Sequence, residues 1–168
     1  MTKDKNFWIW LAGFIDGEGC VSIQPQWTKK GYRTFLPKLA IGNTDKKVLM
    51  LILRNTYPEK TLLHHEQHKN PRAKTIYNIN FTGEKAIVIL EKVYPYLTVK
   101  KQQGKILKGW KLLHRSKKGN LPKIRLQEEK YKKIRLLNKR GKTDEDLQKL
   151  QRSSKRNKKR IKRNGHRS

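Results

Sequence analysis

The chain has little of three things: cysteine, acidic side chains and long apolar runs. Cys20 is the single cysteine among 168 residues, so no disulfide can form within the chain and an oxidising compartment is not indicated. The apolar segment from Phe7 to Ile15 is too short to span a bilayer, and acids follow it where a signal peptide would have a cleavage site. We therefore expect an intracellular protein without a membrane partner, in a compartment that the composition does not specify.

Basic residues outnumber the scarce acids along the whole chain. Lys and Arg number 42 against 13 Asp and Glu, which gives a formal net charge of +29. Residues 1–140 contain 31 basic and 10 acidic side chains, and residues 141–168 contain 11 and 3. Such an excess predicts a polyanionic partner, most simply nucleic acid. The length predicts one domain over 1–140, with a core at about 7–115, followed by a basic tail over 141–168.

Two acids separated by one glycine end a short apolar stretch, WIWLAGFIDGEG, at residues 8–19. Gly13 and Gly17 lie four residues apart and would share one face of a helix. A glycine inside a helix costs about 1 kcal/mol relative to alanine, so two at this spacing indicate close packing of another helix. The alternative is an ordinary helix end with solvated acids, although carboxylates there face the negative end of the helix dipole.

The segment LAGFIDGEG resembles the LAGLIDADG motif of homing endonucleases, with matches at Leu11, Ala12, Gly13, Ile15, Asp16 and Gly19. The resemblance implies an α+β protein with an αββαββα fold, a saddle-shaped antiparallel sheet and additional C-terminal helices. It also implies that two motif helices pack together. Because the motif occurs once in this chain, we expect a homodimer. The expected interface residues are Ala12, Gly13, Asp16 and Gly17, with Asp16 mainly structural.

Periodicity predicts the same order of elements. Alternating apolar and polar residues predict strands over 21–28, 33–41 and 74–81, and a less clear strand over 61–68. Val21, Ile23 and Trp27 are expected on the buried face of the first strand. Apolar stripes predict helices over 43–57, capped by Asn43 or Thr44, and over 84–93. A basic helix over 121–140 follows, whereas 153–168 is mostly charge and is predicted to be disordered when free.

The resemblance implies a metal-dependent catalytic centre. Glu18, at the eighth motif position, would bind a divalent metal together with the main-chain carbonyl of Gly17. Oxygen ligands suit a hard cation, so Mg²⁺ is expected, with Mn²⁺ or Ca²⁺ as other occupants. Lys100 in TVKKQQ would stabilise the transition state or serve as an ordinary phosphate contact, and Gln102 would order water. Asp45 takes the place of a water-ordering glutamine, or else complements a helix dipole.

The polar face of the predicted strands is rich in amides, hydroxyls and lysines, which suits contact with base edges in the major groove. An ordinary solvated face is the alternative. Nine residues of strand cover about 30 Å, or about nine base pairs, so a dimer would read roughly 18 base pairs. The predicted DNA contacts are Ser22, Gln24, Gln26, Thr28, Lys29, Lys30, Arg33, Thr34, Lys38, Arg72, Lys74, Asn78 and Asn80.

The residues and the resemblance together predict a homodimeric endonuclease that cuts both strands of a long pseudo-palindromic double-stranded DNA target. It would leave short 3′ overhangs and promote intron homing. Two other functions remain compatible with the sequence. A group I intron RNA maturase would use the same fold and basic surface on intron RNA, and a non-catalytic DNA-binding regulator would keep the fold without cleavage.

Overall fold

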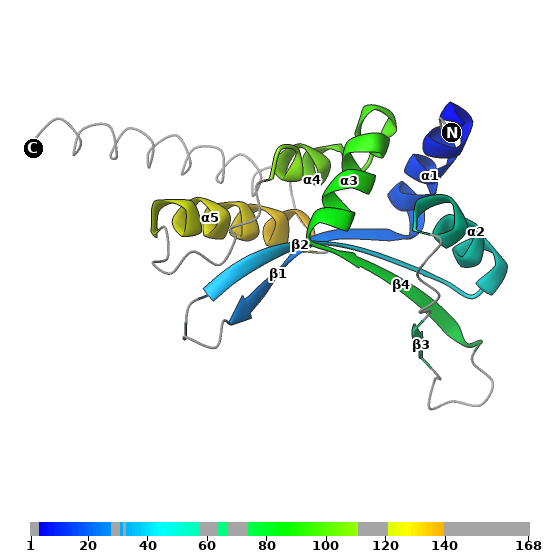
Figure 1. Cartoon of the computed structure of the whole chain (residues 1–168), viewed down its shortest axis with the longest axis horizontal. Helices are drawn as coiled ribbons and strands as arrows, with labels where there is room; N and C mark the ends of the chain where they lie inside the picture. Colours follow the sequence, from blue (N-terminus) through cyan, green and yellow to red (C-terminus); the bar gives the residue numbers. More distant parts are fainter. Residues whose placement is uncertain are drawn as a thin grey trace, which may run out of the picture.

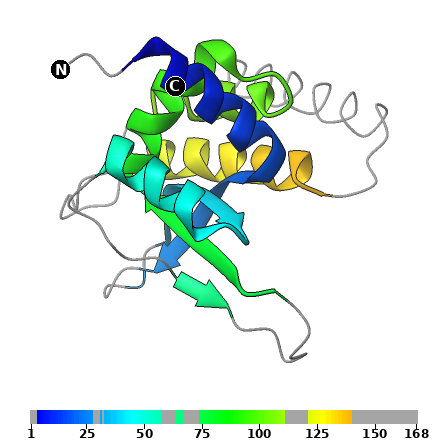
Figure 2. The same cartoon turned by 90° about the vertical axis from the view of Figure 1, so that its right-hand side faces the viewer.

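In the computed structural model, a layer of helices covers one face of a single antiparallel sheet (Figure 1). The structure describes residues 4–27, 31, 33–57, 64–66, 74–110 and 121–139. The view turned by 90° shows the same separation, with the helices together on one side of the strands (Figure 2). None of the described helices is long and apolar enough to cross a membrane.

After helix α1 (Lys5–Glu18), the unit strand–strand–helix occurs twice. The first unit consists of β1 (Gly19–Trp27), β2 (Arg33–Asn43) and α2 (Lys46–Thr56). The second consists of β3 (His64–Glu66), β4 (Ile76–Thr82) and α3 (Glu84–Val93). The remaining described elements are the 3₁₀ turn η1 (Tyr94–Tyr96), α4 (Lys101–Leu107) and α5 (Leu121–Leu137). The predicted α+β class and αββαββα order, with additional C-terminal helices, are confirmed.

The sheet has the strand order β1-β2-β4-β3, with every pair antiparallel. Strand β1 pairs with β2 from Gly19 opposite Ile41 to Trp27 opposite Arg33, and this register puts the alternating apolar residues of neighbouring strands on one face. That face forms the core under the helices, as predicted. Its buried strand residues include Val21, Ile23, Phe35, Leu39, Ile41, Ile79 and Phe81.

The outer end of the β1–β2 hairpin differs from the prediction. Trp27, expected to be buried, is 72% exposed because it ends an edge strand. Its partner Arg33 lies on the helix side of the sheet, where its guanidinium carbon stands 5.3 Å from the ring centroid of Phe35 and 5.6 Å from that of Tyr131. Contact with these two rings holds Arg33 away from the opposite face. Its grouping with the DNA contacts is therefore corrected.

Helix α5 is part of the core rather than an appendage. Tyr131 packs on Phe35 with ring centroids 5.5 Å apart, and Ile134 is only 1% exposed. Just after the helix, the side-chain amide of Asn138 donates a 2.9 Å hydrogen bond to the carbonyl of Val21 in β1. These contacts fix the helix across β1 and β2, on the side that the apolar residues occupy.

Helices α4 and α5 also hold each other through polar contacts. The Gln103 side-chain amide lies 3.4 Å from Asn138 Oδ1, and Lys130 Nζ stands 5.2 Å from the ring centroid of Trp110. Burial lowers the pKa of Lys130, and the neighbouring charge of Lys133 lowers it further. The two C-terminal helices therefore form one packed unit on the helix side.

No described helix covers the other face of the sheet, which we call the open face. Both ends of the sheet curve away from the helices, so the open face is concave (Figure 1). This curvature corresponds to the predicted saddle. The open face is therefore the surface on which a long, rod-like partner would fit.

Candidate active site

The motif helix ends at an abrupt junction with the sheet. Helix α1 stops at Glu18, and Gly19 begins β1 immediately, with its N–H bonded to the carbonyl of Ile15. A Cβ at position 19 would lie 2.7 Å from that carbonyl oxygen and 2.9 Å from the Ile15 Cα, so only glycine fits without displacement of backbone. The last glycine of the motif thus places Glu18 at the point where helix and sheet meet.

Asp16 ties the motif helix to a segment that is distant in sequence. Its carboxylate accepts the backbone N–H of Thr98 at 2.6 Å and that of Lys100 at 2.8 Å. The Lys100 ammonium in turn donates to the main-chain carbonyl of Asp16. These bonds join residues 82 and 84 positions apart and bring Lys100 to the end of α1 where Glu18 lies. The predicted structural role of Asp16 therefore operates within its own chain.

We expect Asp16→Ala to lower the free energy of unfolding by about 2 kcal/mol, because two backbone donors lose a charged acceptor. Urea unfolding of the purified variant measures this loss. Asp45→Ala is the matched control, since that carboxylate accepts one backbone N–H and its removal should cost about 1 kcal/mol. Equal midpoints for wild type and Asp16→Ala would show that the two bonds do not stabilise the fold.

The end of α1 carries ligands suited to a hard cation. The side chain of Glu18 is exposed, and Gly17 is exposed beside it. The last carbonyl groups of a helix lack partners within the helix, so Gly17 adds a main-chain oxygen to the carboxylate. Within the described part of the chain, no three His, Cys, Asp or Glu side chains gather into a metal cluster. Of the two acids of the motif, Asp16 is engaged by backbone N–H groups, so Glu18 is the exposed carboxylate at this helix end.

One face of α1 has no covering element among the described residues. A Cβ at Gly13 or at Gly17 would meet no atom within 4 Å, although both sit inside a helix. Ile9 and Trp10, on the same side one turn earlier, are 43% and 39% exposed. Ala12, by contrast, is 0% exposed in the chain's own core, so its predicted place at a dimer interface is corrected.

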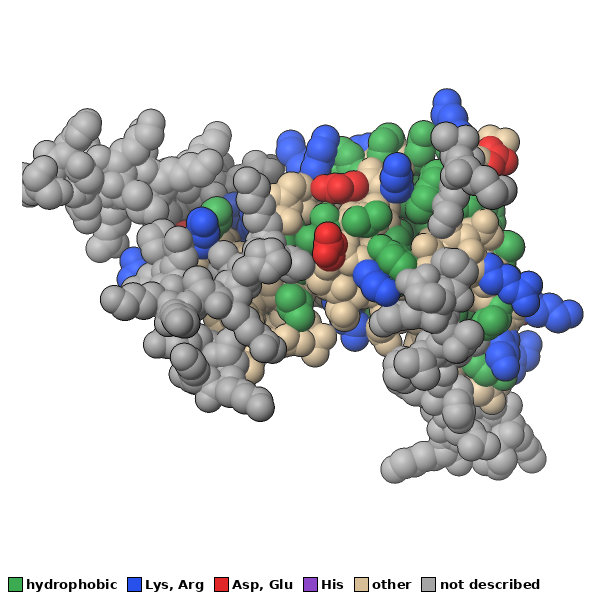
Figure 3. Space-filling view, viewed as in Figure 1, with side chains coloured by type: hydrophobic (Ala, Val, Ile, Leu, Met, Phe, Trp, Pro, Cys, Tyr) green, Lys and Arg blue, Asp and Glu red, His purple; other side chains and the backbone are tan. Residues whose placement is uncertain are grey.

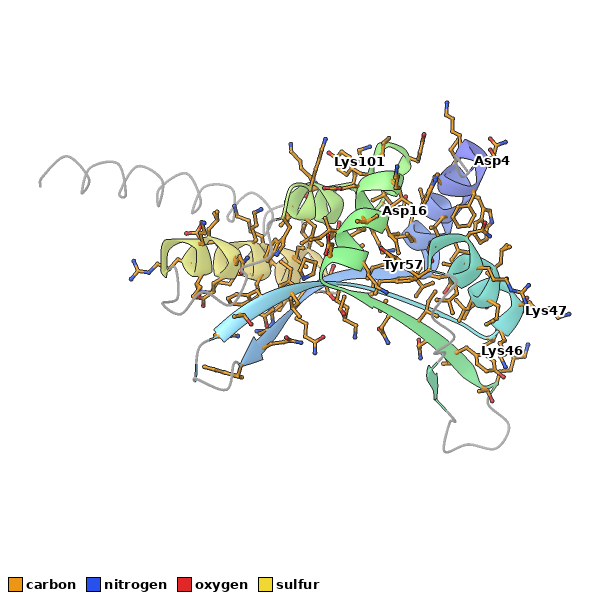
Figure 4. The ribbon with its side chains drawn as sticks, in the orientation of Figure 1. Asp4, Asp16, Lys46, Lys47, Tyr57 and Lys101 are labelled. Carbon is orange, nitrogen blue, oxygen red and sulfur yellow. The ribbon has the colours of Figure 1, made fainter. Side chains whose placement is uncertain are left out.

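The other predicted catalytic residues lie at two places. Gln102 is exposed in the first turn of α4, two residues after Lys100. Asp45 caps α2, one residue later than the predicted cap: its Oδ1 accepts the N–H of Lys47 at 2.8 Å, and Asn43 Oδ1 accepts the N–H of Asp45 at 2.8 Å. Lys46 and Lys47 project outward from this capped end (Figure 4). Asp45 is thus the N-cap of α2 rather than a first-turn residue, and its catalytic role stays a prediction.

Most of the predicted DNA contacts share the open face. The register pairs Ser22 with Lys38 and Lys38 with Thr82, and it pairs Gly42 with Asn78. Residues directly opposite in antiparallel strands point to the same side, so the open face also holds residues outside the predicted set of DNA contacts, among them Leu36 and Thr82. The predicted residues that it contains are Ser22, Gln24, Gln26, Thr34, Lys38, Asn78 and Asn80.

The remaining predicted contacts lie elsewhere. Lys74 is exposed but precedes β4, so it is not part of the strand that was expected to contain it. Four predicted contacts lie outside the described residues: Thr28, Lys29, Lys30 and Arg72. The tail over 141–168 also lies outside them. Thr82 continues the alternation of Asn78 and Asn80 in β4 and lies opposite Lys38, but the predicted strand ended at residue 81 and so left it out.

Comparison with known proteins gives one sequence match and several similar folds. The model of the LAGLIDADG endonuclease family matches residues 11–111. No curated protein matches the chain. The solved structures that resemble it include the homing endonuclease I-CvuI in complex with the I-CreI target in the presence of 2 mM Mg, where the DNA is not cleaved. That structure has a TM-score of 0.61 and 22% identity, over 87% of this chain and 95% of that one.

Two further structures agree. I-CvuI with its own target in the presence of 2 mM Ca gives a TM-score of 0.57 at 22% identity, over 87% of this chain and 95% of that chain. The archaeal intron-encoded homing endonuclease I-Vdi141I, complexed with DNA, gives 0.57 at 16% identity, over 88% and 94%. At these identities the structural likeness supports the fold alone.

Proposed function

This chain belongs to the LAGLIDADG endonuclease family, and on that basis we propose that it is a homing endonuclease acting as a homodimer on double-stranded DNA. It cuts both strands of a long pseudo-palindromic target with a divalent metal, leaves short 3′ overhangs and promotes the homing of its intron. The observation that carries the proposal is the exposed Glu18 at the end of the motif helix, where Lys100 is bonded to Asp16, at the junction with the concave open face of the sheet.

The homodimer follows from what one chain lacks. The motif occurs once, and the described residues gather no cluster of three metal-ligating side chains at its end. Of its two acids, Asp16 accepts two backbone N–H groups, which leaves Glu18 as the carboxylate for a metal. The uncovered face of α1, with Gly13 and Gly17 free of intrachain contact, permits a second α1 to approach closely. Two copies paired there would put both Glu18 carboxylates near one axis. Because like charges repel at short range, a cation between them would stabilise the pair.

The metal ligands are the Glu18 carboxylate and the main-chain carbonyl of Gly17, whose oxygen chemistry fits Mg²⁺, with Mn²⁺ and Ca²⁺ as alternatives. The structures of I-CvuI with Mg and with Ca support this class of ion. When bound, the ion supplies charge neutralisation at phosphate oxygens and a more acidic water.

The chain's own groups supply positioning and charge around the scissile phosphate. Lys100, held at the end of α1 by its bonds to Asp16, directs its ammonium to the phosphate and stabilises the developing negative charge. The exposed amide of Gln102 orders water nearby. The open face holds the duplex so that the phosphate lies at Glu18. Asp45, committed to capping α2, contributes through the position of that helix.

The direct test uses the gene that contains the intron, in the form from which the intron is absent. Purified protein should linearise a plasmid carrying that sequence in Mg²⁺ and leave it intact in EDTA, and end mapping should reveal 3′ overhangs. Specific binding of the plasmid without cleavage in any divalent metal would indicate a non-catalytic regulator. Absence of both binding and cleavage would refute the proposal.

A second candidate function is binding of intron RNA, as in a maturase. Helix α4, on the helix side of the sheet, contains Lys101 and Lys105 and is followed directly by Lys108. Nζ of Lys101 and Nζ of Lys108 stand 4.7 Å and 5.0 Å from the Tyr94 ring centroid. Basic side chains are also visible along the helix side in the space-filling view (Figure 3). Charge reversal at Lys105 should weaken RNA binding and spare DNA cleavage if this candidate is correct.

The basic tail should increase affinity for DNA without contributing sequence specificity. Residues 153–168 carry eight basic and no acidic side chains, so their deletion should weaken binding to any duplex alike. Each phosphate contact contributes about 0.9 to the slope of log affinity against log salt, so loss of several contacts flattens that slope measurably. Binding across a salt series, on target and scrambled duplexes, measures both quantities. A tenfold fall in the target-to-scrambled ratio would instead assign sequence reading to the tail.

A further inference from the structure

The open face presents its side chains in cross-strand rows. Ser22, Lys38 and Thr82 form one row across β1, β2 and β4, which we call the Lys38 row. Two residues farther along β1, Gln24 lies opposite Leu36, and we call this pair the Gln24 row. The residues between these rows, Ile23 and its partner Pro37, are buried under the helices. The rows therefore point to the open face together, at fixed intervals.

Lys38 has a distinctive position on this face. Among the described open-face residues of β1, β2 and β4, it is the one charged side chain, and the others are amides, hydroxyls, small residues or apolar groups. Its side chain is half-buried between the hydroxyl residues Ser22 and Thr82. Within the part of the chain that the structure describes, no ion pair engages it. Its ammonium therefore projects from between Ser22 and Thr82 toward the side where DNA would bind, and no acid of the described chain is paired with it.

The Gln24 row has different chemistry. Gln24 is exposed, and Leu36 places a large apolar side chain opposite it on the open face. A glutamine amide matches the N6 and N7 edge of adenine, and an apolar group contacts the thymine methyl. A lysine ammonium, by contrast, matches the O6 and N7 acceptors of guanine. The two rows therefore favour different base pairs.

Their separation gives the spacing on DNA. Rows two residues apart along a strand lie about 6.6 Å apart, which is close to two base pairs at about 3.4 Å each. Strand β1 starts at the end of α1 and runs outward, so the Gln24 row lies farther from Glu18 than the Lys38 row does. The order of the two rows, counted outward from Glu18, therefore predicts the order of the two base pairs that they contact in each half of the target.

We propose that each half-site contains a G·C pair read by Lys38 and, about two base pairs farther from the centre, an A·T pair read by Gln24 and Leu36. This inference rests on the proposed function, because it assumes that the open face holds the target. It goes beyond that function in assigning base identities and their order. The two halves of the pseudo-palindrome carry the pattern as mirror images.

The test is a selection from a library of duplexes in which the half-site is randomised and repeated symmetrically. Full-length protein binds the library, and the bound duplexes are sequenced. Wild type should enrich G·C at one position per half and A·T about two positions outward. Lys38→Ala should reduce a preference of roughly tenfold at the first position to less than about twofold, with the rest of the profile unchanged. Lys38→Gln should shift that position toward adenine, and Leu36→Ala should relax only the outer position.

The matched control is Lys92→Ala, which removes the same charge from an exposed site in the last turn of α3 and should leave the whole profile as in wild type. If Lys38→Ala weakens binding equally to all sequences and reduces the salt slope by about 1.8, which is about 0.9 for each protomer of the dimer, Lys38 contacts a phosphate and the inference is wrong. A wild-type profile with other bases at these positions also overturns it, while the proposed function stands. A wild type that enriches no sequence at all overturns both.

Discussion

Glu18→Gln is expected to reduce Mg²⁺-dependent cleavage by at least about a hundredfold while target binding stays within about twofold of wild type. The amide keeps the shape of the carboxylate but loses the charge that holds a cation, and loss of about 3 kcal/mol of transition-state stabilisation gives a decrease of this size. Binding is unaffected because Glu18 sits at the helix end and the open-face rows make the base contacts.

Supercoiled plasmid nicking measures the cleavage, and gel-shift titration in Ca²⁺ measures the binding. Glu91→Gln is the matched control, because that carboxylate is exposed on α3 and its loss should leave both quantities unchanged. Retention of more than a few per cent of the wild-type nicking rate by Glu18→Gln would count against the assignment of the metal ligand.

Gly13→Leu is expected to convert the dimer to monomers and to abolish double-strand cleavage. A branched side chain at the closest approach of two helices forces their axes apart, and overpacking of this kind costs about 1–3 kcal/mol in each chain. The chain itself has room, since a Cβ at this position meets nothing within 4 Å. The variant should therefore still fold, and the defect should be confined to association.

Sedimentation measures the state of association, and thermal unfolding confirms that the monomer remains folded. Gly13→Ala separates helix propensity from packing: it should favour the isolated helix by about 1 kcal/mol and still weaken the dimer. If Gly13→Leu sediments as a dimer and cleaves normally, the two glycines of α1 are not at the interface.

The strands and helices were predictable because their causes are local. Alternation at Val21, Ile23, Leu39 and Ile41 reports burial on one side of a strand, and the structure buries each of these side chains. Helix α3 begins and ends at the residues that the apolar stripe and the following proline indicate. The fold and the motif helix thus follow from periodicity together with one short motif.

Where sequence reasoning failed, the cause lies in contacts between distant segments. Arg33 reads as one more basic residue of a polar strand, yet it stacks on Tyr131, which is almost a hundred positions away in α5. Ala12 fits a stripe of small residues, but the neighbouring helices of its own chain bury it completely. The cap at Asp45 depends on which of three adjacent polar residues adopts the turn, and their similar propensities do not distinguish them.

The hydrogen bond between Asn138 and Val21 also has a consequence for synthesis of the chain. It joins residues 117 positions apart, and the nearby Ile134 completes the same core. At about 5–20 residues per second, β1 therefore leaves the ribosome on the order of ten seconds before the helix that covers it is made. During that interval the apolar side of the β1–β2 hairpin is exposed to chaperones and to other nascent chains. Nascent chains arrested before Ile134 should be cleaved by protease in β1, and chains extended past Asn138 should resist it.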